Sequence, residues 1–463
     1  MRVNFIRLIF RTLCIMPFIL TACDTDENHS FASYVDSITA KVQDGNSLRV
    51  DLNIHFLRSA FYQIEYWDVK DERKKKRTTV REGNGLTTCT LVLLKPETTY
   101  AFQVLINGKE SVLSGIYQFE TLSLPSMVPD CYIEFDELED IDGYMVLSRF
   151  DLKPGLTTII DMQGNTVWYQ EMEEKGVSVA SFDTLHHTVQ CIMGGQSGYA
   201  YSGSDIIVMD LFGNILLQKD VRDYGLHHEI RRMPDGNLLM VNHVYRDFDL
   251  SAVGGSTHET VVGDGVVIMD MQGNIVWNWE CFSEIDPRED EDIMTANVGP
   301  GDWVHANSAN YDEDGNIYVT FNWLNQIWKI NRETKEIEYR LGEDGTIDLN
   351  PEGWVSGVHN VNVTGPDSFY LFDNGTLSHQ SRILGYKVDK SIGKAVIDFN
   401  VLLPTDKSSQ FQGGVNILNS NLMIVCSTFS NAILFIDKSG QIHRIIRTPY
   451  QSYRAEYIPP FEY

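Results

Sequence analysis

Histidines are the residues in this sequence whose type and spacing point most clearly to chemistry. His228, His305 and His359 each stand at the start of a short apolar run that a Gly-containing turn closes, which is how a β-strand begins. An imidazole with a pKa near 6.5 can donate or accept a proton close to neutral pH. If the fold brings these strand starts together, the three side chains form one polar site.

The elements that must position these histidines repeat along the chain. One hairpin turn occurs three times, at 161–168, 210–217 and 270–277, each time after an apolar run and with Gly-Asn, residues that we expect to supply positive φ. A second turn alternates with the first, at 234–237, 312–316 and 365–368. Two alternating hairpins per unit predict four-stranded blades around a common axis, which is a β-propeller.

The predicted starts of inner strands give the number of blades. Five residues precede the runs that lead into the second turn: His187, His228, His305, His359 and Gly414. One more blade begins near Cys131, with 143–148 as its inner strand, so the propeller has six blades. Two insertions, 246–263 and 282–300, lengthen the interval between His228 and His305, and such loops commonly cover a central funnel. Inner strands converge on the axis, so we expect the histidines to share a pocket.

A second β unit precedes the propeller. Apolar and polar residues alternate as in strands between residues 37 and 122. Leu94–Val104 resembles the fibronectin type III pattern, in which a Pro-containing corner feeds a strand led by a buried tyrosine, here Tyr100, whose hydroxyl bonds back to the corner. We therefore expect an all-β protein with a small fibronectin type III-like β-sandwich over 37–122, a linker, and a six-bladed β-propeller over 130–463.

The first residues predict export. Arg2, Arg7 and Arg11 precede the apolar run 13–20, and Leu20–Cys23 resembles the lipobox of bacterial lipoproteins. We expect a signal peptide over 1–22, a lipidated Cys23 that attaches the protein to the membrane, a tether over 23–36, and a place in the cell envelope on the periplasmic or surface face of the outer membrane. An ordinary secretory signal or an anchor helix is the alternative, although the run is short for a bilayer span.

Charge and cysteine content argue against two other classes of protein. The net charge of −27 repels nucleic acid, so we expect no nucleic-acid partner. The cysteines that follow Cys23 are widely spread and lack Cys-x-x-Cys spacing, which favours buried small hydrophobes over a disulfide framework or a zinc site.

The histidine blocks resemble the bacterial arylsulfate sulfotransferases. The resemblance rests on 302–308 with Asp312, Gly315 and Asn316, on 329–330, 340–342, His359, 372–375 and 381–382, and on 227–230 with 234–237. It covers nearly the whole exported chain, because that family also joins a small β-sandwich to a six-bladed propeller. It implies transfer of a sulfuryl group from an aryl sulfate to a phenol by a ping-pong route, independent of 3′-phosphoadenylyl sulfate and without a cofactor or metal.

The resemblance also implies roles for the histidines. A histidine at the position of His359 is the nucleophile that becomes sulfated, and histidines matching His228 and His305 stand close by. They would transfer protons or bind the sulfonate group.

One departure from the family concerns substrate binding. An arginine usually stands where this sequence has Asn322, and losing an oxyanion donor costs about 10² to 10³ in rate. Arg231, Arg232 and Arg382 are open as replacements, with ordinary ion pairing as the alternative. Asn307, Asn322, Trp323 and Arg382 form the expected substrate-binding set, with Trp323 as a surface for an aryl ring.

Two other functions stay open. A metal-dependent enzyme would use His227, His228, Glu229, His305 and His359 to hold a divalent ion, although adjacent residues of a strand point to opposite faces. A non-catalytic propeller would bind glycans or peptides. The sequence leaves the natural substrates and a homodimer undecided.

Overall fold

A computed structural model of the protein describes residues 30–106, 112–149, 154–172, 175–194, 203–296 and 298–463. The predicted signal peptide and Cys23 lie outside the described residues. Within them, the regular elements are β-strands and short 3-10 helices, which confirms the all-β prediction. Nowhere in the described ranges is there a helix of the length and apolar character needed to span a membrane.

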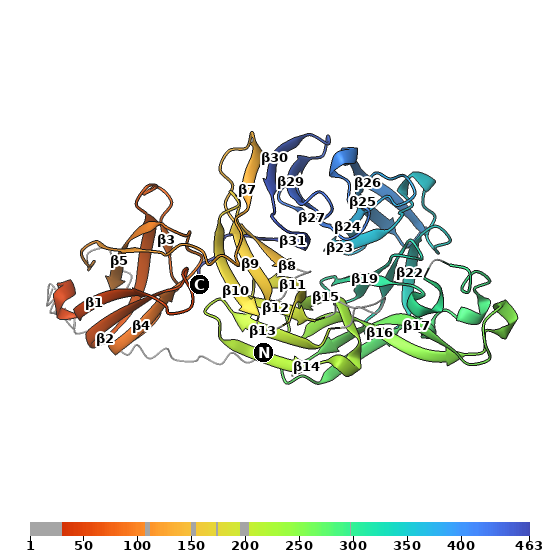
Figure 1. Ribbon diagram of the computed structural model, residues 1–463, viewed down its shortest axis with the longest axis horizontal. Coiled ribbons are helices and arrows are strands. Elements are labelled where there is room, and N and C mark those ends of the chain that lie inside the picture. Colours follow the sequence, from red (N-terminus) through yellow and green to blue (C-terminus); the bar gives the residue numbers. More distant parts are fainter. Residues whose placement is uncertain (1–29, 107–111, 150–153, 173–174, 195–202, 297) are drawn as a thin grey trace, which may run out of the picture.

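A small β-sandwich lies at one side of the molecule (Figure 1). Its elements are η1 (Phe31–Ser33), β1 (Val35–Val42), β2 (Val50–Asp68), β3 (Lys76–Arg77), β4 (Arg81–Leu91), β5 (Thr99–Ile106) and β6 (Tyr117–Glu120). The long strand β2 links all the strands that pair with it. Its first part pairs with β1 and β4, and its last part pairs with β3 and β5. The Tyr100 hydroxyl accepts a hydrogen bond from the Lys95 N–H at 2.9 Å, so the predicted corner is present. Strand β1 starts at Val35, inside the segment predicted as a tether.

Six further sheets make the propeller. The first two blades contain β8 (Tyr144–Arg149), β9 (Gly155–Asp161), β10 (Thr166–Met172) and β31 (Ser452–Ile458), then β11 (Val177–Asp183), β12 (Thr188–Met193), β13 (Asp205–Asp210) and β14 (Ile215–Asp220). The third contains η2 (Arg222–Tyr224), β15 (Leu226–Arg232), β16 (Leu238–Phe248), η3 (Ser251–Val253), β17 (Glu259–Met269) and β18 (Ile275–Glu280). The short helices η4 (Cys281–Ser283), η5 (Pro287–Glu289) and η6 (Gly299–Asp302) follow.

The last three blades complete the circle. They contain β19 (Ala306–Tyr311), β20 (Ile317–Phe321), β21 (Gln326–Ile330) and β22 (Ile337–Gly342); η7 (Pro351–Gly353), β23 (Val358–Gly365), β24 (Ser368–Asp373), β25 (Arg382–Asp389) and β26 (Lys394–Leu402); and η8 (Thr405–Lys407), β27 (Gly414–Ile417), β28 (Leu422–Ser427), β29 (Ala432–Asp437), β30 (Ile442–Arg447) and β7 (Tyr132–Asp136). The inner strands β31, β11, β15, β19, β23 and β27 contact one another in this order, and β27 contacts β31 again. The ring of six blades is therefore closed.

The ring closes through strands far apart in sequence. Strand β31 pairs with β8, from Ile458 beside Tyr144 to Ser452 beside Arg149, and is the inner strand of the first blade. The prediction that 143–148 is that inner strand is therefore wrong, because β8 is second in the sheet. Strand β7 adds to the outer edge of the last blade by pairing with β30.

The predicted turns are present, with two corrections. In the first turn type Gly164, Gly213 and Gly273 have φ near 90°, whereas the asparagines that follow them do not have positive φ. Each asparagine instead bonds the aspartate that opens the turn, as Asn165 bonds Asp161. The second correction is His187, which lies between β11 and β12 and stacks on Phe461 at 4.6 Å instead of starting an inner strand.

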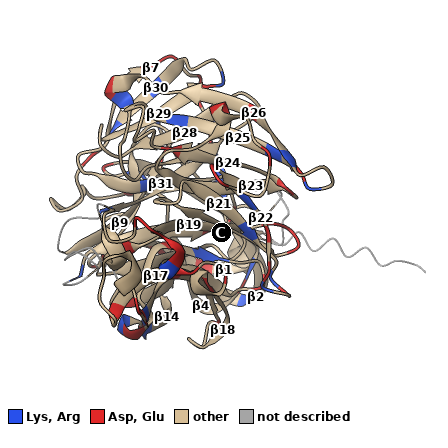
Figure 2. Ribbon diagram, turned by 90° about the vertical axis from the view of Figure 1, so that its right-hand side faces the viewer, with Lys and Arg blue, Asp and Glu red and all other residues tan. Residues whose placement is uncertain are grey.

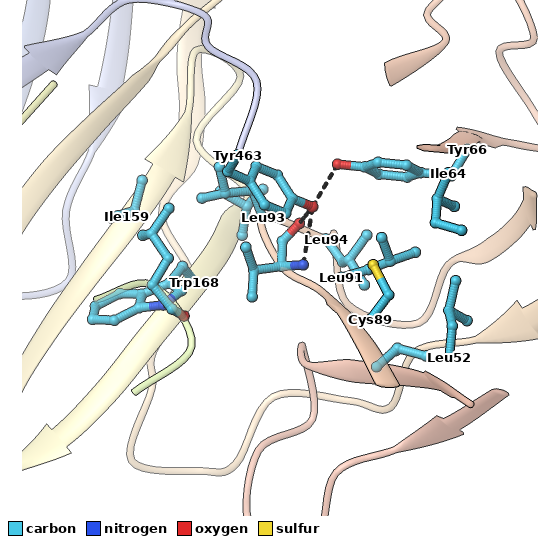
Figure 3. Close-up of a cluster of buried hydrophobic side chains, with 14 of the residues drawn as sticks. Leu52, Ile64, Tyr66, Cys89, Leu91, Leu93, Leu94, Ile159, Trp168 and Tyr463 are labelled. Atoms are coloured by element: carbon cyan, nitrogen blue, oxygen red, sulfur yellow. Dashed lines mark hydrogen bonds between the residues drawn. The ribbon is translucent and has the colours of Figure 1, made fainter. Parts of the chain in front are cut away.

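An apolar cluster is buried between each pair of neighbouring blades, and the one between the first two blades continues into the core of the sandwich. Charged residues lie mainly in loops and at strand ends (Figure 2). Cys89, Cys191, Cys281 and Cys426 are buried as free thiols, in agreement with their predicted role as small hydrophobes. The sandwich joins the propeller through Tyr463, whose hydroxyl bonds both backbone groups of Val92 and the hydroxyl of Tyr66 (Figure 3).

Candidate active site

The three predicted catalytic histidines lie where inner strands of neighbouring blades begin. His228 belongs to β15, His305 directly precedes β19, and His359 belongs to β23. Each of these strands shifts register against the next strand close to its start. A bulge of this kind re-aims nearby side chains and is common beside active sites.

Backbone pairing shows that the histidines are not at equivalent positions of the repeat, contrary to the prediction. An N–H group within β16, or directly after β20 and β24, donates to the carbonyl just before the inner strand: His243 to Gly225, Asn322 to His305, and Asn374 to Gly357. His305 thus stands where two other blades have glycine, and it shares their positive φ, at 49°. Such a conformation costs a bulky residue about 1 kcal/mol or more and is typical of functional positions.

The fold nevertheless brings the imidazoles together. The ring centroids of His228 and His305 are 5.0 Å apart, and that of Tyr453 lies 5.7 Å from His228. Burial and the charge of His305 lower the pKa of His359 to about 3, so these two rings also lie close enough to interact. The site therefore gathers side chains from three consecutive blades and from β31.

An amide holds His359. Asn374 donates its side-chain N–H groups to the carbonyls of Ser409 and Gln412, so its oxygen must face Nδ1 of His359. Nδ1 therefore carries the proton, with the Gly357 carbonyl as a second acceptor at 3.3 Å. Nε2 has no hydrogen bond to any described residue and keeps its lone pair. His359 is thus a neutral imidazole with a free nitrogen, which is the form of a nucleophile.

A carboxylate holds His305. Asp302, at the end of η6, lies 2.8 Å from Nδ1 of His305 and also accepts the indole N–H of Trp323 at 3.2 Å. Burial opposes a charge on His305, but the bond to Asp302 and its negative charge raise the pKa of this imidazole above its ordinary value. The second predicted insertion ends beside this residue, where Trp303 donates to Asp290 at 2.7 Å. His305 is therefore the imidazole of the site that favours the cation.

The predicted substrate-binding residues have different surroundings. Trp323 is 39% exposed, with its ring 5.5 Å from that of His305, so it can face a substrate. Asn322 lies beside His359 but bonds the Val358 carbonyl at 3.3 Å. Asn307 is fully buried, accepts from Thr320 and donates to Val358, so it joins blades and does not line the site.

The arginines considered as replacements are committed elsewhere. Arg382 bonds Asp373 at 2.8 Å and two backbone carbonyls, Arg231 bonds Glu456 at 3.2 Å, and Arg232 bonds Thr188 at 3.0 Å. None of these contacts faces the three imidazoles, so ordinary pairing describes them.

Strand β31 contributes to the site, although the sequence patterns did not predict it. Arg454 is buried, donates to Glu229 at 2.7 Å and to the Asn307 carbonyl at 2.8 Å, and its positive charge helps to lower the pKa of His359. Glu229 is one residue from His228, so this ion pair stands beside the site. The polar Arg-Ala-Glu run within an otherwise strand-like segment was the available signal.

A buried polar group lies behind His228 and was not predicted from the sequence either. Asp264 Oδ1 lies 3.0 Å from Nε2 of His227 and 3.0 Å from Nδ1 of His243, whose rings stack at 3.8 Å. Among the described residues, His227, His243 and Asp264 are the His, Cys, Asp or Glu side chains that lie close enough together to hold a metal ion. Their possible ligand atoms lie within 4.8 Å of one another. The predicted metal-binding set of His227, His228, Glu229, His305 and His359 does not form such a group. A charged residue in the apolar strand β17 was the signal that could have revealed it.

Other hollows lie away from the histidines. One hollow has a volume of 680 Å³ and lies between sandwich and propeller, lined by Asn46, Leu122, Tyr169 and their neighbours. Its lining contains none of the imidazoles.

Comparison with known proteins decides the family. The sequence profile of the arylsulfotransferase (ASST) family matches residues 139–397, which is more than half of the chain. The chain belongs to the arylsulfotransferase family. This arylsulfotransferase is therefore an enzyme of sulfuryl transfer, with aryl sulfates and phenols as its general substrate classes. The resemblance of the histidine blocks to this family is thereby confirmed.

The arylsulfotransferase matches no curated protein. Among solved structures it is similar to a protein of unknown function from Bacteroides caccae, at 11% identity and a TM-score of 0.44, covering 69% of this chain and 99% of that one. It is also similar to the virginiamycin B lyase of Staphylococcus aureus, at 11% identity and a TM-score of 0.36, covering 68% of this chain and 87% of that one.

Proposed function

We propose that this protein moves a sulfuryl group from an aryl sulfate to a phenol through a sulfohistidine at His359, without 3′-phosphoadenylyl sulfate. The observation that carries the proposal is the orientation of Asn374, which leaves Nε2 of His359 with a lone pair. A pKa lowered to about 3 keeps that nitrogen unprotonated at neutral pH. A neutral nucleophile suits attack on an anionic sulfate ester.

The first half-reaction forms the intermediate. Nε2 of His359 attacks sulfur, the bond between sulfur and the ester oxygen breaks, and its electron pair leaves with the phenolate. In the second half-reaction the oxygen of the acceptor attacks sulfur and the S–N bond returns its pair to Nε2. Each phenol exchanges its proton with an imidazole of the site.

His305 supplies positive charge for the sulfonate oxygens. Asp302 favours the imidazolium form of His305. The His305 ring lies beside both His228 and the exposed Trp323. This cation takes over part of the role of the arginine that Asn322 replaces, because a fixed charge in a buried site stabilises charge that shifts in the transition state. Trp323 offers a face for the aryl ring.

One experiment tests the nucleophile. The protein is mixed with 4-nitrophenyl sulfate, nitrophenolate release is followed with and without a phenol, and the sulfated residue is located by mass spectrometry. We expect a burst without acceptor and sulfate on His359, and no burst from His359→Ala. Equal release by His359→Ala, with a folded protein, would remove His359 from the mechanism.

We also propose that Cys23 carries lipid and holds the enzyme on the cell envelope. The support is the lipobox-like Leu20–Cys23. Metabolic labelling with a fatty acid should mark the protein and leave Cys23→Ser unmarked. Labelling of both to the same extent would contradict the anchor.

A further inference from the structure

We infer that Asp264 and His227 hold His228 as the proton-transfer group of both half-reactions, and that these two residues, which the resemblance leaves without a role, are its positioning residues. The inference rests on the proposed sulfuryl transfer and adds a division of labour among its histidines. It comes from a chain of hydrogen bonds, Asp264 to His227 to His228, that runs from the interior of the third blade to the site.

Asp264, at the buried end of this hydrogen-bond chain, determines which ring nitrogens of the histidines carry protons. Asp264 is 1% exposed and receives three contacts, from the Ala306 N–H at 2.7 Å and from His227 and His243 at 3.0 Å each. Burial opposes its charge, but the bonds from the two imidazoles hold its pKa below the ordinary value. A carboxylate only accepts hydrogen bonds, so Nε2 of His227 carries a proton and donates a hydrogen bond to Asp264.

The tautomer of His227 in turn determines that of His228. Burial and the charge of His243 lower the pKa of His227 to about 4, so this ring is neutral near pH 7 and its Nδ1 has a lone pair. Nδ1 of His228 lies 2.6 Å from that atom and must donate to it. The second nitrogen of His228, Nε2, is left as a free acceptor, without a hydrogen bond to any described residue.

An acceptor in this place completes the reaction. The acceptor phenol gives its O–H proton to Nε2 of His228 as its oxygen attacks sulfur, and the imidazolium that forms is stabilised through His227 by Asp264. The imidazolium then loses this proton, either to water or to the phenolate of a donor that is already bound, and His228 returns to the neutral form of the resting protein. The groups that surround His228 are His227, His243, His305, His359 and Tyr453. Of these, His305 already bonds Asp302 and favours the cation, so it is not the free acceptor.

The backbone makes Asp264→Asn a sharp test. The Ala306 N–H needs an acceptor, so the new amide oxygen turns toward it and the NH₂ group faces His227 and His243. His227 would then carry its proton on Nδ1, and His228 would be forced to carry its own on Nε2. The substitution therefore reverses the tautomers along the chain and removes the free acceptor.

The experiment compares acceptors. After sulfation by 4-nitrophenyl sulfate, transfer is measured to phenol, which has a pKa of about 10 and needs a base, and to pentafluorophenol, which is ionised at the assay pH. We expect Asp264→Asn to slow transfer to phenol about 10²-fold, as loss of a general base does, and to spare pentafluorophenol. Equal losses with both acceptors, or no loss with phenol, would overturn the inference.

The stacked pair supplies matched variants. His227→Phe removes the link to His228 and should behave as Asp264→Asn does, whereas His243→Phe removes only a second donor to Asp264 and should lose less. Asp312→Asn controls for the loss of a buried carboxylate, since Asp312 pairs with Lys329 at 3.1 Å in a turn away from the histidines. If His243→Phe and His227→Phe lose the same activity, the hydrogen bonds that run from Asp264 through His227 to His228 have no special role, and the inference is overturned.

Two measurements separate this inference from the proposed function. The ¹⁵N shifts of His228 in the resting protein report its tautomer whether or not His359 becomes sulfated. A proton on Nδ1 supports the inference, and a proton on Nε2 overturns it. Stoichiometric metal in the active protein would also overturn it, because an ion on Nε2 of His227 forces the reversed tautomers.

Discussion

The starts of β19 and β23 present the same side chain in two different settings. His305 has its Nδ1 against the carboxylate of Asp302, and His359 has its Nδ1 against the amide oxygen of Asn374. The carboxylate raises the pKa of His305 above its ordinary value despite burial, whereas burial lowers the pKa of His359 to about 3. The partner of Nδ1 thus decides whether an imidazole acts as a cation or as a nucleophile.

The two histidines also differ in backbone. His305 has a φ of 49°, in the region that Gly225 and Gly357 occupy in the neighbouring blades, whereas the φ of His359 is not positive. One imidazole belongs to a residue with positive φ just before a strand, and the other belongs to a residue with ordinary φ at the start of a strand where the register shifts. The comparison therefore makes separate predictions for charge and for conformation.

The largest expected effect comes from removing the negative charge of Asp302, which faces His305 at the start of β19. Asp302→Asn leaves Nδ1 of His305 without a carboxylate, so its pKa falls and the imidazolium is lost near pH 7. We expect turnover to fall by about 10² to 10³, similar to the loss of an oxyanion donor, with aryl sulfates of good and poor leaving groups alike. Steady-state rates measure this. An effect confined to poor leaving groups would instead make His305 the proton donor.

The reverse exchange at β23 should have a smaller effect. Asn374→Asp puts a carboxylate beside His359 and raises the pKa of that imidazole. Nucleophilic attack then slows by about tenfold for each pH unit by which the new pKa exceeds the assay pH, and raising the pH restores it. Burst rates from pH 5 to 9 measure this. A loss that no pH recovers would show that Asn374 acts by packing.

The pH profile of the unaltered enzyme sharpens the same contrast. His305 works protonated, and its raised pKa preserves that form until the pH rises above its ordinary value of 6.5. His359 works unprotonated, and with His227 it titrates only as the pH falls to about 4 and then about 3. We expect a plateau between these limits, and Asp302→Asn should move its alkaline edge to lower pH. An alkaline edge that stays in place would break the assignment.

The smallest effect concerns stability. His305→Gly should be more stable than His305→Ala by about 1 kcal/mol, because only glycine adopts positive φ without cost. At His359 the order should reverse, since glycine in a strand costs about 0.5 to 1 kcal/mol relative to alanine. Denaturant unfolding of the four variants measures both differences. The same order at both positions would contradict the backbone comparison.

Local patterns in the sequence predicted the repeat well. Turns such as 161–168 and 312–316 depend on residues close together in the chain, so the hairpins and the number of blades could be found. The gathering of His228, His305 and His359 followed from the radial arrangement. The Lys95 to Tyr100 bond of the sandwich was equally local.

Contacts between distant segments could not be read in the same way. The pairing of β31 with β8 joins segments about 300 residues apart, and no local signal identifies the partner. Asn374 acquires its role from two carbonyls in the following blade, and Asp264 from two imidazoles on two neighbouring strands, β15 and β16. The Gly-like position of His305 became visible only when backbone hydrogen bonds aligned the blades.

The late position of β31 has a consequence for folding. Strand β31 brings Arg454 to Glu229 and to the carbonyl of Asn307, residues that the chain supplies long before it. Until that strand is inserted, Glu229 lacks Arg454 at 2.7 Å and has only Arg231 at 3.6 Å, and the neighbourhood of His228 is incomplete. Catalytic activity should therefore emerge only with the final step of assembly, so that a nascent or partly unfolded chain releases no sulfuryl group.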